Sequence, residues 1–250
     1  MPNLTAHIDI ALECAASLPH PAIQRNPGAF VLGSCSPDIR IVTRGPRDDT
    51  HFVSIHNETL GAGPAAMLQE HPSLSKGREL SECTLAFMSG YICHLLTDEA
   101  WIIKVYRPFF GNRAIFADEM LANVVDRALQ LDMDRTAVER REGFREVTPI
   151  LADAHQGVAV EFIDGDSLSE FRLRVSEATQ RAFTWERLLA MARRQYPQQN
   201  GAAEAVAQRF LDDLPHSLEQ AYQRVPRQAI QSFRDTILGE WSQAMRAYLP

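Results

Sequence analysis

Residues 86–105 read AFMSGYICHLLTDEAWIIKV, and this stretch decides the fold of the chain. Its apolar residues lie nearly all round a helix, which predicts a helix that is buried on every side. His94 and Asp98 interrupt it four residues apart, so both side chains project from the same face. A buried carboxylate is costly unless a cation or a hydrogen-bond donor meets it. The helix therefore predicts either a His–Asp pair in the core or a metal site, because imidazole and carboxylate are both zinc ligands.

The rest of the chain predicts helices and almost no strand. Thr50 is expected to cap a helix that residues 61–64 interrupt, and Asp134 is expected to cap the helix that runs towards Gln156. Only residues 158–163 alternate as a strand would, and that run is too short to found a sheet. Helical periodicity is present in residues 4–18, 21–32, 86–105, 116–131, 134–156, 167–192, 202–211 and 228–248. We predict an all-α, single-domain multi-helix bundle over residues 1–250, with a metal-site half (1–133) and an additional helical half (134–250).

Composition limits the classes of partner. The 250 residues are 45% hydrophobic, which is enough for a sizeable core. A net charge of −7 without a basic run argues against duplex nucleic acid. Residues 1–20 lack the basic start of a signal peptide, and no apolar run is long enough for a membrane span. The cysteines show no CxxC spacing and are expected to be buried thiols: Cys14, Cys35, Cys83 and Cys93. We expect a soluble cytoplasmic protein, whose oligomeric state the sequence leaves open.

Three more residues have the chemistry of metal ligands and stand at special positions. His7 lies in the first turn of the helix over residues 4–18, and His51 in the first turn of the helix that Thr50 is expected to cap. Asp38 follows Pro37 at the head of a loop. Alone, each has an ordinary explanation, as a core histidine or a turn aspartate. Together with His94 and Asp98 they make three imidazoles and two carboxylates, a set that suits zinc.

Four segments resemble, in order, the motifs of the zinc-dependent phospholipase C family. They are LTAHIDIALECA (4–15), FVLGSCSPDI (30–39), DDTHF (48–52) and FMSGYICHLLTDEAW (87–101). The family includes bacterial phosphatidylcholine-hydrolysing enzymes and the amino-terminal domain of glycosylphosphatidylinositol-specific phospholipase D, and S1/P1-type nucleases share its fold. The resemblance implies a mostly helical fold with a metal cluster at the base of a cleft.

The resemblance also implies roles for individual residues. His51, His94 and Asp98 match the ligands of one zinc ion. His7 matches a ligand of a second zinc ion, with Asp98 bridging the pair. Asp38 matches the carboxylate that touches the metal site and orients or deprotonates the attacking water.

The family's third metal is usually held by two histidines and a glutamate just beyond the HxxxD helix. This chain has no histidine between Asp98 and His155, so that set is absent. Asp118, Glu119 and Asp126 follow instead, and we expect them to form a solvated helix face. The resemblance therefore implies two zinc ions.

The chemistry of this site predicts a zinc-dependent phosphodiester hydrolase that uses a metal-activated water, with Asp38 as general base or water-positioning group. Its expected substrate is a small phosphodiester or a phospholipid headgroup. One alternative is an S1/P1-like nuclease, which needs a basic or aromatic track beside the cleft, and Arg40, Arg44 and Arg47 are the near candidates. The other is a non-catalytic helical protein with a structural metal.

Overall fold

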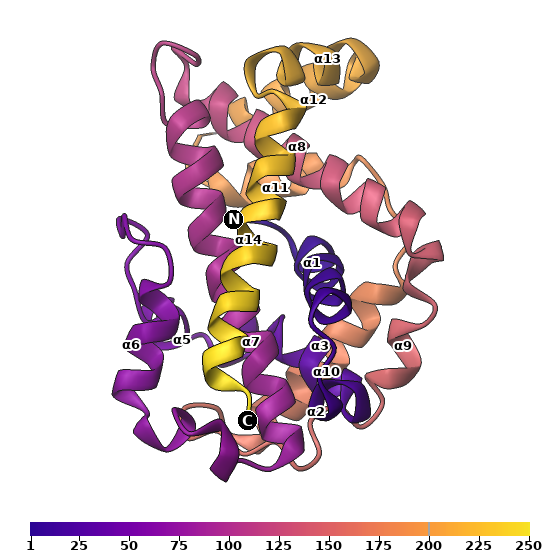
Figure 1. Ribbon diagram of the computed structural model, residues 1–250. Coiled ribbons are helices and arrows are strands. Elements are labelled where there is room, and N and C mark those ends of the chain that lie inside the picture. The colour runs from indigo at the N-terminus through magenta and orange to yellow at the C-terminus, as the bar shows by residue number, and fades with distance from the viewer. Residues whose placement is uncertain (200) are drawn as a thin grey trace.

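Helices form the regular structure of the molecule (Figure 1). The computed structural model describes residues 1–199 and 201–250, is 72% helical, and contains no strand within those ranges. The α-helices are α1 (Leu4–Ser17), α2 (Pro21–Arg25), α3 (Pro27–Gly33), α4 (Arg40–Thr43), α5 (Asp48–His51), α6 (Ala62–Glu70), α7 (Glu82–Trp101), α8 (Glu119–Arg140), α9 (Val147–Ile150), α10 (Gly165–Gln180), α11 (Arg187–Gln195), α12 (Ala202–Asp212), α13 (Leu214–Arg224) and α14 (Arg227–Tyr248). Short 3₁₀ turns are η1 (Ser36–Ile39), η2 (Pro72–Leu74), η3 (Gly77–Glu79) and η5 (Glu142–Phe144), and η4 (Ile102–Phe110) is a π-helix. The all-α prediction is confirmed.

Helix α7 is the buried centre of the fold. The Ser81 hydroxyl caps its first turn by accepting the Thr84 amide at 3.2 Å. Every residue from Thr84 to Trp101 is buried, as an all-round apolar sequence predicts. Helices α1, α3 and α14 pack around it, and α14 runs alongside it in Figure 1. The helix ends at Trp101 and continues as the π-helix η4, so the α-helical part is shorter than expected at its carboxyl end.

Two glycines let α3 and α7 approach to backbone contact. A Cβ added at Gly33 would lie 1.9 Å from the Phe87 carbonyl oxygen, and one at Gly90 would lie 2.0 Å from the Phe30 carbonyl oxygen. No side chain fits into that space, so both positions require glycine. The close crossing brings the backbone after α3 against the face of α7 that carries His94.

The second half of the chain completes the core around α7. The indole of Trp241, on α14, donates to the Ser89 carbonyl at 3.0 Å. Phe233 packs edge-on against Trp101 at 5.2 Å between ring centroids. On α1, Asp9 is fully buried and accepts hydrogen bonds from arginines of α14 and of the end of α8: Arg140, Arg141 and Arg234. Residues beyond 133 therefore cover the helix that carries His94 and Asp98.

Several expected helices have different limits. Residues 21–32 form two helices, because Pro27 disfavours the helical conformation at Asn26, which has φ −127° and ψ 53°. The helix expected over residues 167–192 breaks between Gln180 and Arg187. Pro215 lies in the first turn of α13, where proline is tolerated. Residues 158–163 form no strand.

Two expected caps are wrong. Asp118 caps α8 by accepting the amides of Met120 and Leu121, and the helix continues to Arg140, so Asp134 lies inside it. Thr50 lies within α5, its hydroxyl bonded to the Arg47 carbonyl at 3.1 Å. His51 is therefore the last residue of α5 and not in the first turn of a longer helix, because Phe52 leaves the helical region at φ 61°.

None of the helices within the described ranges is long and apolar enough to span a membrane.

Candidate metal centre

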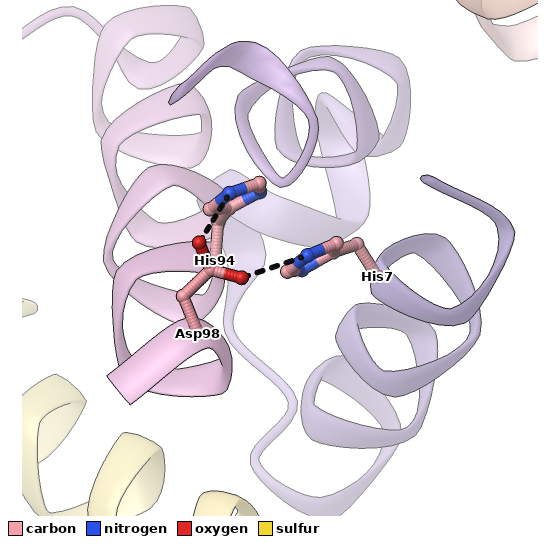
Figure 2. A group of neighbouring side chains, drawn as sticks. All are labelled: His7, His94 and Asp98. Atoms are coloured by element: carbon pink, nitrogen blue, oxygen red, sulfur yellow. Dashed lines mark ion pairs between the residues drawn. The ribbon is translucent and has the colours of Figure 1, made fainter. Parts of the chain in front are cut away.

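Five side chains that are far apart in the sequence come together beside α7. His7 comes from α1, Asp38 from η1, His51 from the end of α5, and His94 and Asp98 from α7. They form two overlapping groups, His7–His94–Asp98 and Asp38–His51–His94, and the ligand atoms within each group lie within 4.8 Å of one another. Figure 2 shows the ring of His7 reaching from α1 towards Asp98, with His94 one turn away on α7.

Asp98 lies at the centre of this cluster, and its two oxygens face different histidines. Oδ1 is 3.3 Å from Nε2 of His7. Oδ2 is 3.2 Å from Nε2 of His51 and 3.7 Å from Nε2 of His94. The rings of His7 and His94 stack at 3.8 Å between centroids, so the histidine that faces Oδ1 and one that faces Oδ2 are in direct contact.

Backbone carbonyls orient two of the imidazoles. Nδ1 of His94 lies 2.8 Å from the Ser34 carbonyl, and Nδ1 of His51 lies 3.2 Å from the Arg47 carbonyl. We infer that both Nδ1 atoms carry the proton and donate it, which leaves each Nε2 with a free lone pair. The Tyr91 hydroxyl donates to the Thr50 carbonyl at 2.6 Å and so ties α5, with His51, to α7.

The atoms that face one another in the cluster have no hydrogen-bond partners among the described residues. They are both ring nitrogens of His7, Nε2 of His51, Nε2 of His94 and Oδ1 of Asp98. All four residues are at most 2% exposed. Unpaired buried polar atoms are rare because each one costs about 1–3 kcal/mol. Imidazole nitrogens and a carboxylate oxygen around a common point are a zinc donor set, so the residues present fit that metal.

Residues 6–101 match the model of the family described as zinc-dependent phospholipase C. This segment of the chain is similar to that family. It contains all five clustered residues, and the resemblance inferred from the four motifs is confirmed. No curated protein and no solved structure matches the chain. The family match indicates zinc and phosphodiester hydrolysis, and it does not cover residues 102–250.

Burial and mutual charge shift the pKa values of the clustered residues in different directions. Burial lowers the pKa of His7, and the neighbouring His94 lowers it further. Burial opposes ionisation of Asp98, but His94 and the other two imidazoles outweigh it and hold the pKa of Asp98 well below its usual range. For His94, burial disfavours the proton and the Asp98 carboxylate outweighs that effect, so its pKa is raised. The carboxylate therefore favours its ionised form, and a metal ion would compete with a proton for Nε2 of His94.

Asp38 differs from the other members because it is partly exposed, whereas the three histidines and Asp98 are buried. It lies in the 3₁₀ turn η1 rather than at the head of an open loop, and its amide donates to the Cys35 carbonyl at 3.0 Å. Asp38 is thus the member of the cluster on the solvent side.

Two further residues at the centre were not predicted as site residues. Arg47 reaches inward, and its Nη2 donates to Oδ2 of Asp98 at 3.2 Å. Glu99 accepts the amides of Gly61 and Gly63, each at 2.5 Å, and so anchors the start of α6 to α7. The sequence signal for Glu99 is its place beside Asp98 in a buried helix. Arg47 stands four residues before His51, but nothing in the sequence indicates that its side chain lies inside the protein.

The acidic residues after η4 do not behave as one solvated face. Asp118 and Glu119 are exposed, as expected. Asp126 is buried, which contradicts the expectation: its carboxylate accepts the Trp101 indole at 3.0 Å and the Gln130 amide at 2.8 Å. The reason is that this face of α8 packs against the end of α7. Neither of the two candidate metal groups within the described ranges includes these three residues.

A cavity of about 590 Å³ lies between the start of α1, the end of α8 and the α10–α11 connection. None of the five clustered residues lines it. The buried donor set, and not this cavity, is therefore the candidate site.

Proposed function

We propose that the protein is a zinc-dependent phosphodiester hydrolase of the phospholipase C type, acting on a small phosphodiester or a phospholipid headgroup. The observation that carries the proposal is the set of buried, unpartnered imidazole nitrogens around the Asp98 carboxylate, within a segment that matches the family. A structural pair in the core would satisfy these atoms with hydrogen bonds, whereas here three imidazoles lie 3.2–3.7 Å from one carboxylate without forming hydrogen bonds to it.

The two sides of Asp98 suggest two metal positions. We assign His51, His94 and Oδ2 of Asp98 to one zinc ion, and His7 with Oδ1 of Asp98 to a second. The support is that Oδ1 faces His7 while Oδ2 faces the other two imidazoles. When bound, such a metal pair supplies Lewis-acid charge and makes a water molecule more acidic.

Asp38 is assigned as the general base or water-positioning group. It is the partly exposed member of the cluster, within 4.8 Å of ligand atoms of His51 and His94. In the reaction, the oxygen of water forms a bond to phosphorus, its proton passes to the Asp38 carboxylate, and the bond to the leaving oxygen breaks. A proton returned to that oxygen completes the hydrolysis. The Ser34 carbonyl and Tyr91 hold the imidazoles in place while this occurs.

The test is zinc per chain and hydrolysis of a chromogenic phosphodiester, measured on the parent and three variants. Asp38→Asn should retain most of the zinc and lower turnover by about 10²–10⁴-fold, the usual contribution of a general base. His94→Ala should lose zinc and activity together, because it removes one of the imidazoles assigned to the metal and leaves the buried Asp98 carboxylate less well compensated. Asp48→Asn removes an exposed carboxylate of the same segment and should change neither quantity.

Two outcomes decide against the assignment. Full activity in Asp38→Asn would refute the role of Asp38. A parent protein that holds zinc but hydrolyses none of the diesters tested would favour the non-catalytic, structural-metal alternative. The nuclease alternative has less support, because Arg47, one of its three candidate basic residues, is turned towards Asp98.

A further inference from the structure

Arg47 is held rigidly inside the candidate metal centre. Its side chain is only 13% exposed. Nη1 donates to the Val53 carbonyl at 3.1 Å, and Nη2 donates to Oδ2 of Asp98 at 3.2 Å, close to the thioether of Met1. Contacts at both terminal nitrogens fix the plane of the guanidinium group against the carboxylate at the centre of the cluster.

The third nitrogen of this guanidinium has no partner. Nε of Arg47 is buried, and no acceptor lies within hydrogen-bond distance in the described part of the chain. A guanidinium group carries five N–H donors, and three of them are used by the Val53 carbonyl, the Asp98 carboxylate and the Met1 sulfur. An unpaired buried donor on a charged group is unfavourable, so an acceptor beside Asp98 would complete the site.

The charges of the centre show which acceptor fits. Within the described residues, Arg47 is the only arginine or lysine that forms an ion pair with a member of the cluster. The cluster that it contacts through Asp98 is otherwise made of imidazoles and two carboxylates. A planar guanidinium binds phosphate oxygens through parallel hydrogen bonds, which an ammonium group cannot reproduce.

We propose that Arg47 is the phosphate-binding residue of this site, donating from Nε to a non-bridging oxygen of the substrate's phosphoryl group while Nη2 keeps Asp98 in place. This inference rests on the proposed function, and it assigns the recognition of the anionic group to a residue of the protein itself. A role limited to neutralising Asp98 is the alternative, and it predicts no dependence of anion binding on Arg47 once zinc is bound.

The experiment is calorimetric titration of the zinc-loaded protein with inorganic phosphate, with zinc per chain measured on the same samples. Arg47→Gln should keep its zinc and bind phosphate about 10- to 100-fold more weakly, the loss expected for a charge-assisted hydrogen bond. Arg47→Lys should fall between the parent and Arg47→Gln, because it keeps the charge but loses the planar donors. Arg40→Gln, which removes an exposed arginine from the same segment, should bind phosphate as the parent does.

The outcomes separate this inference from the hydrolase proposal. Unchanged phosphate binding in zinc-loaded Arg47→Gln overturns the role of Arg47, whatever the activity. Equal weakening in Arg47→Gln and Arg40→Gln also overturns it, because a general field of positive charge would then explain the binding. Loss of zinc from both Arg47 variants would make Arg47 a support of Asp98 and nothing more. A parent that binds phosphate through Arg47 but hydrolyses no diester would contradict the hydrolase and leave the anion site standing.

Discussion

Asp134 is a single carboxylate that the fold buries completely without satisfying both of its oxygens. Oδ2 accepts the Asn3 side-chain amide at 3.1 Å and lies 3.4 Å from a guanidinium nitrogen of Arg187. Oδ1 is buried and has no partner within the described residues. Burial raises the pKa of Asp134 to about 6, and Arg187 only partly counteracts it. The charged form of this residue is therefore a cost to the folded state.

This cost predicts a pH dependence of stability at the residue scale. Between about pH 4, the pKa of an unfolded aspartate, and about pH 6, the folded protein binds more protons than the unfolded chain. The free energy of unfolding should therefore fall as pH rises through this window, by about 3 kcal/mol in total from this group. Asp134→Asn should remove that part of the decline. Urea unfolding of parent and variant at about pH 4.5 and about pH 7.5 measures it, and identical changes in the two proteins would contradict it.

At the scale of elements, the crossing of α3 and α7 depends on the absence of a side chain at Gly90. Ala is the better helix former by about 1 kcal/mol, so local propensity alone favours Gly90→Ala. The added Cβ would lie 2.0 Å from the Phe30 carbonyl oxygen, which is backbone and can yield only if the helices separate. We expect Gly90→Ala to destabilise the protein by about 2 kcal/mol or more, the range of an overpacked core. Zinc binding should weaken as well, because the Ser34 carbonyl would move away from His94.

Gly239 is the matched control for this prediction. It also lies inside a helix, α14, but a Cβ there would meet nothing within 4 Å. Gly239→Ala should therefore stabilise the protein by up to about 1 kcal/mol. Chemical denaturation of both variants gives the comparison. Similar effects at the two positions would show that the close crossing does not limit the fold.

At the scale of the whole molecule, the packing of α14 on α7 predicts one cooperative domain over residues 1–250. Trp101 and Trp241 are fully buried and report the contact of these two helices, while circular dichroism reports all helices. Thermal or urea unfolding followed by tryptophan fluorescence and by circular dichroism should therefore give coincident midpoints. Separate transitions would instead divide the chain into a metal-site half and an independent helical half.

The sequence by itself determined the central helix and the residues that gather on it. An apolar pattern that surrounds a helix has no stable place except the interior, so the burial of residues 86–101 follows from composition and the 3.6-residue period. His94 and Asp98 share a face because their spacing is a local property of the helix. His7, Asp38 and His51 were found because each belongs to a motif whose order along the chain could be compared with a known family.

Only the tertiary structure decided which other charged groups face the interior. Asp126 and Asp134 lie on α8, where apolar and charged residues are mixed, and a sequence cannot tell which face of such a helix another helix covers. Arg47 directly precedes the short α5, and its Nη2 lies 3.2 Å from Oδ2 of Asp98. Contacts between segments about 50 residues apart are set by the packing of the whole core, because no local preference distinguishes an arginine in solvent from one beside a buried carboxylate.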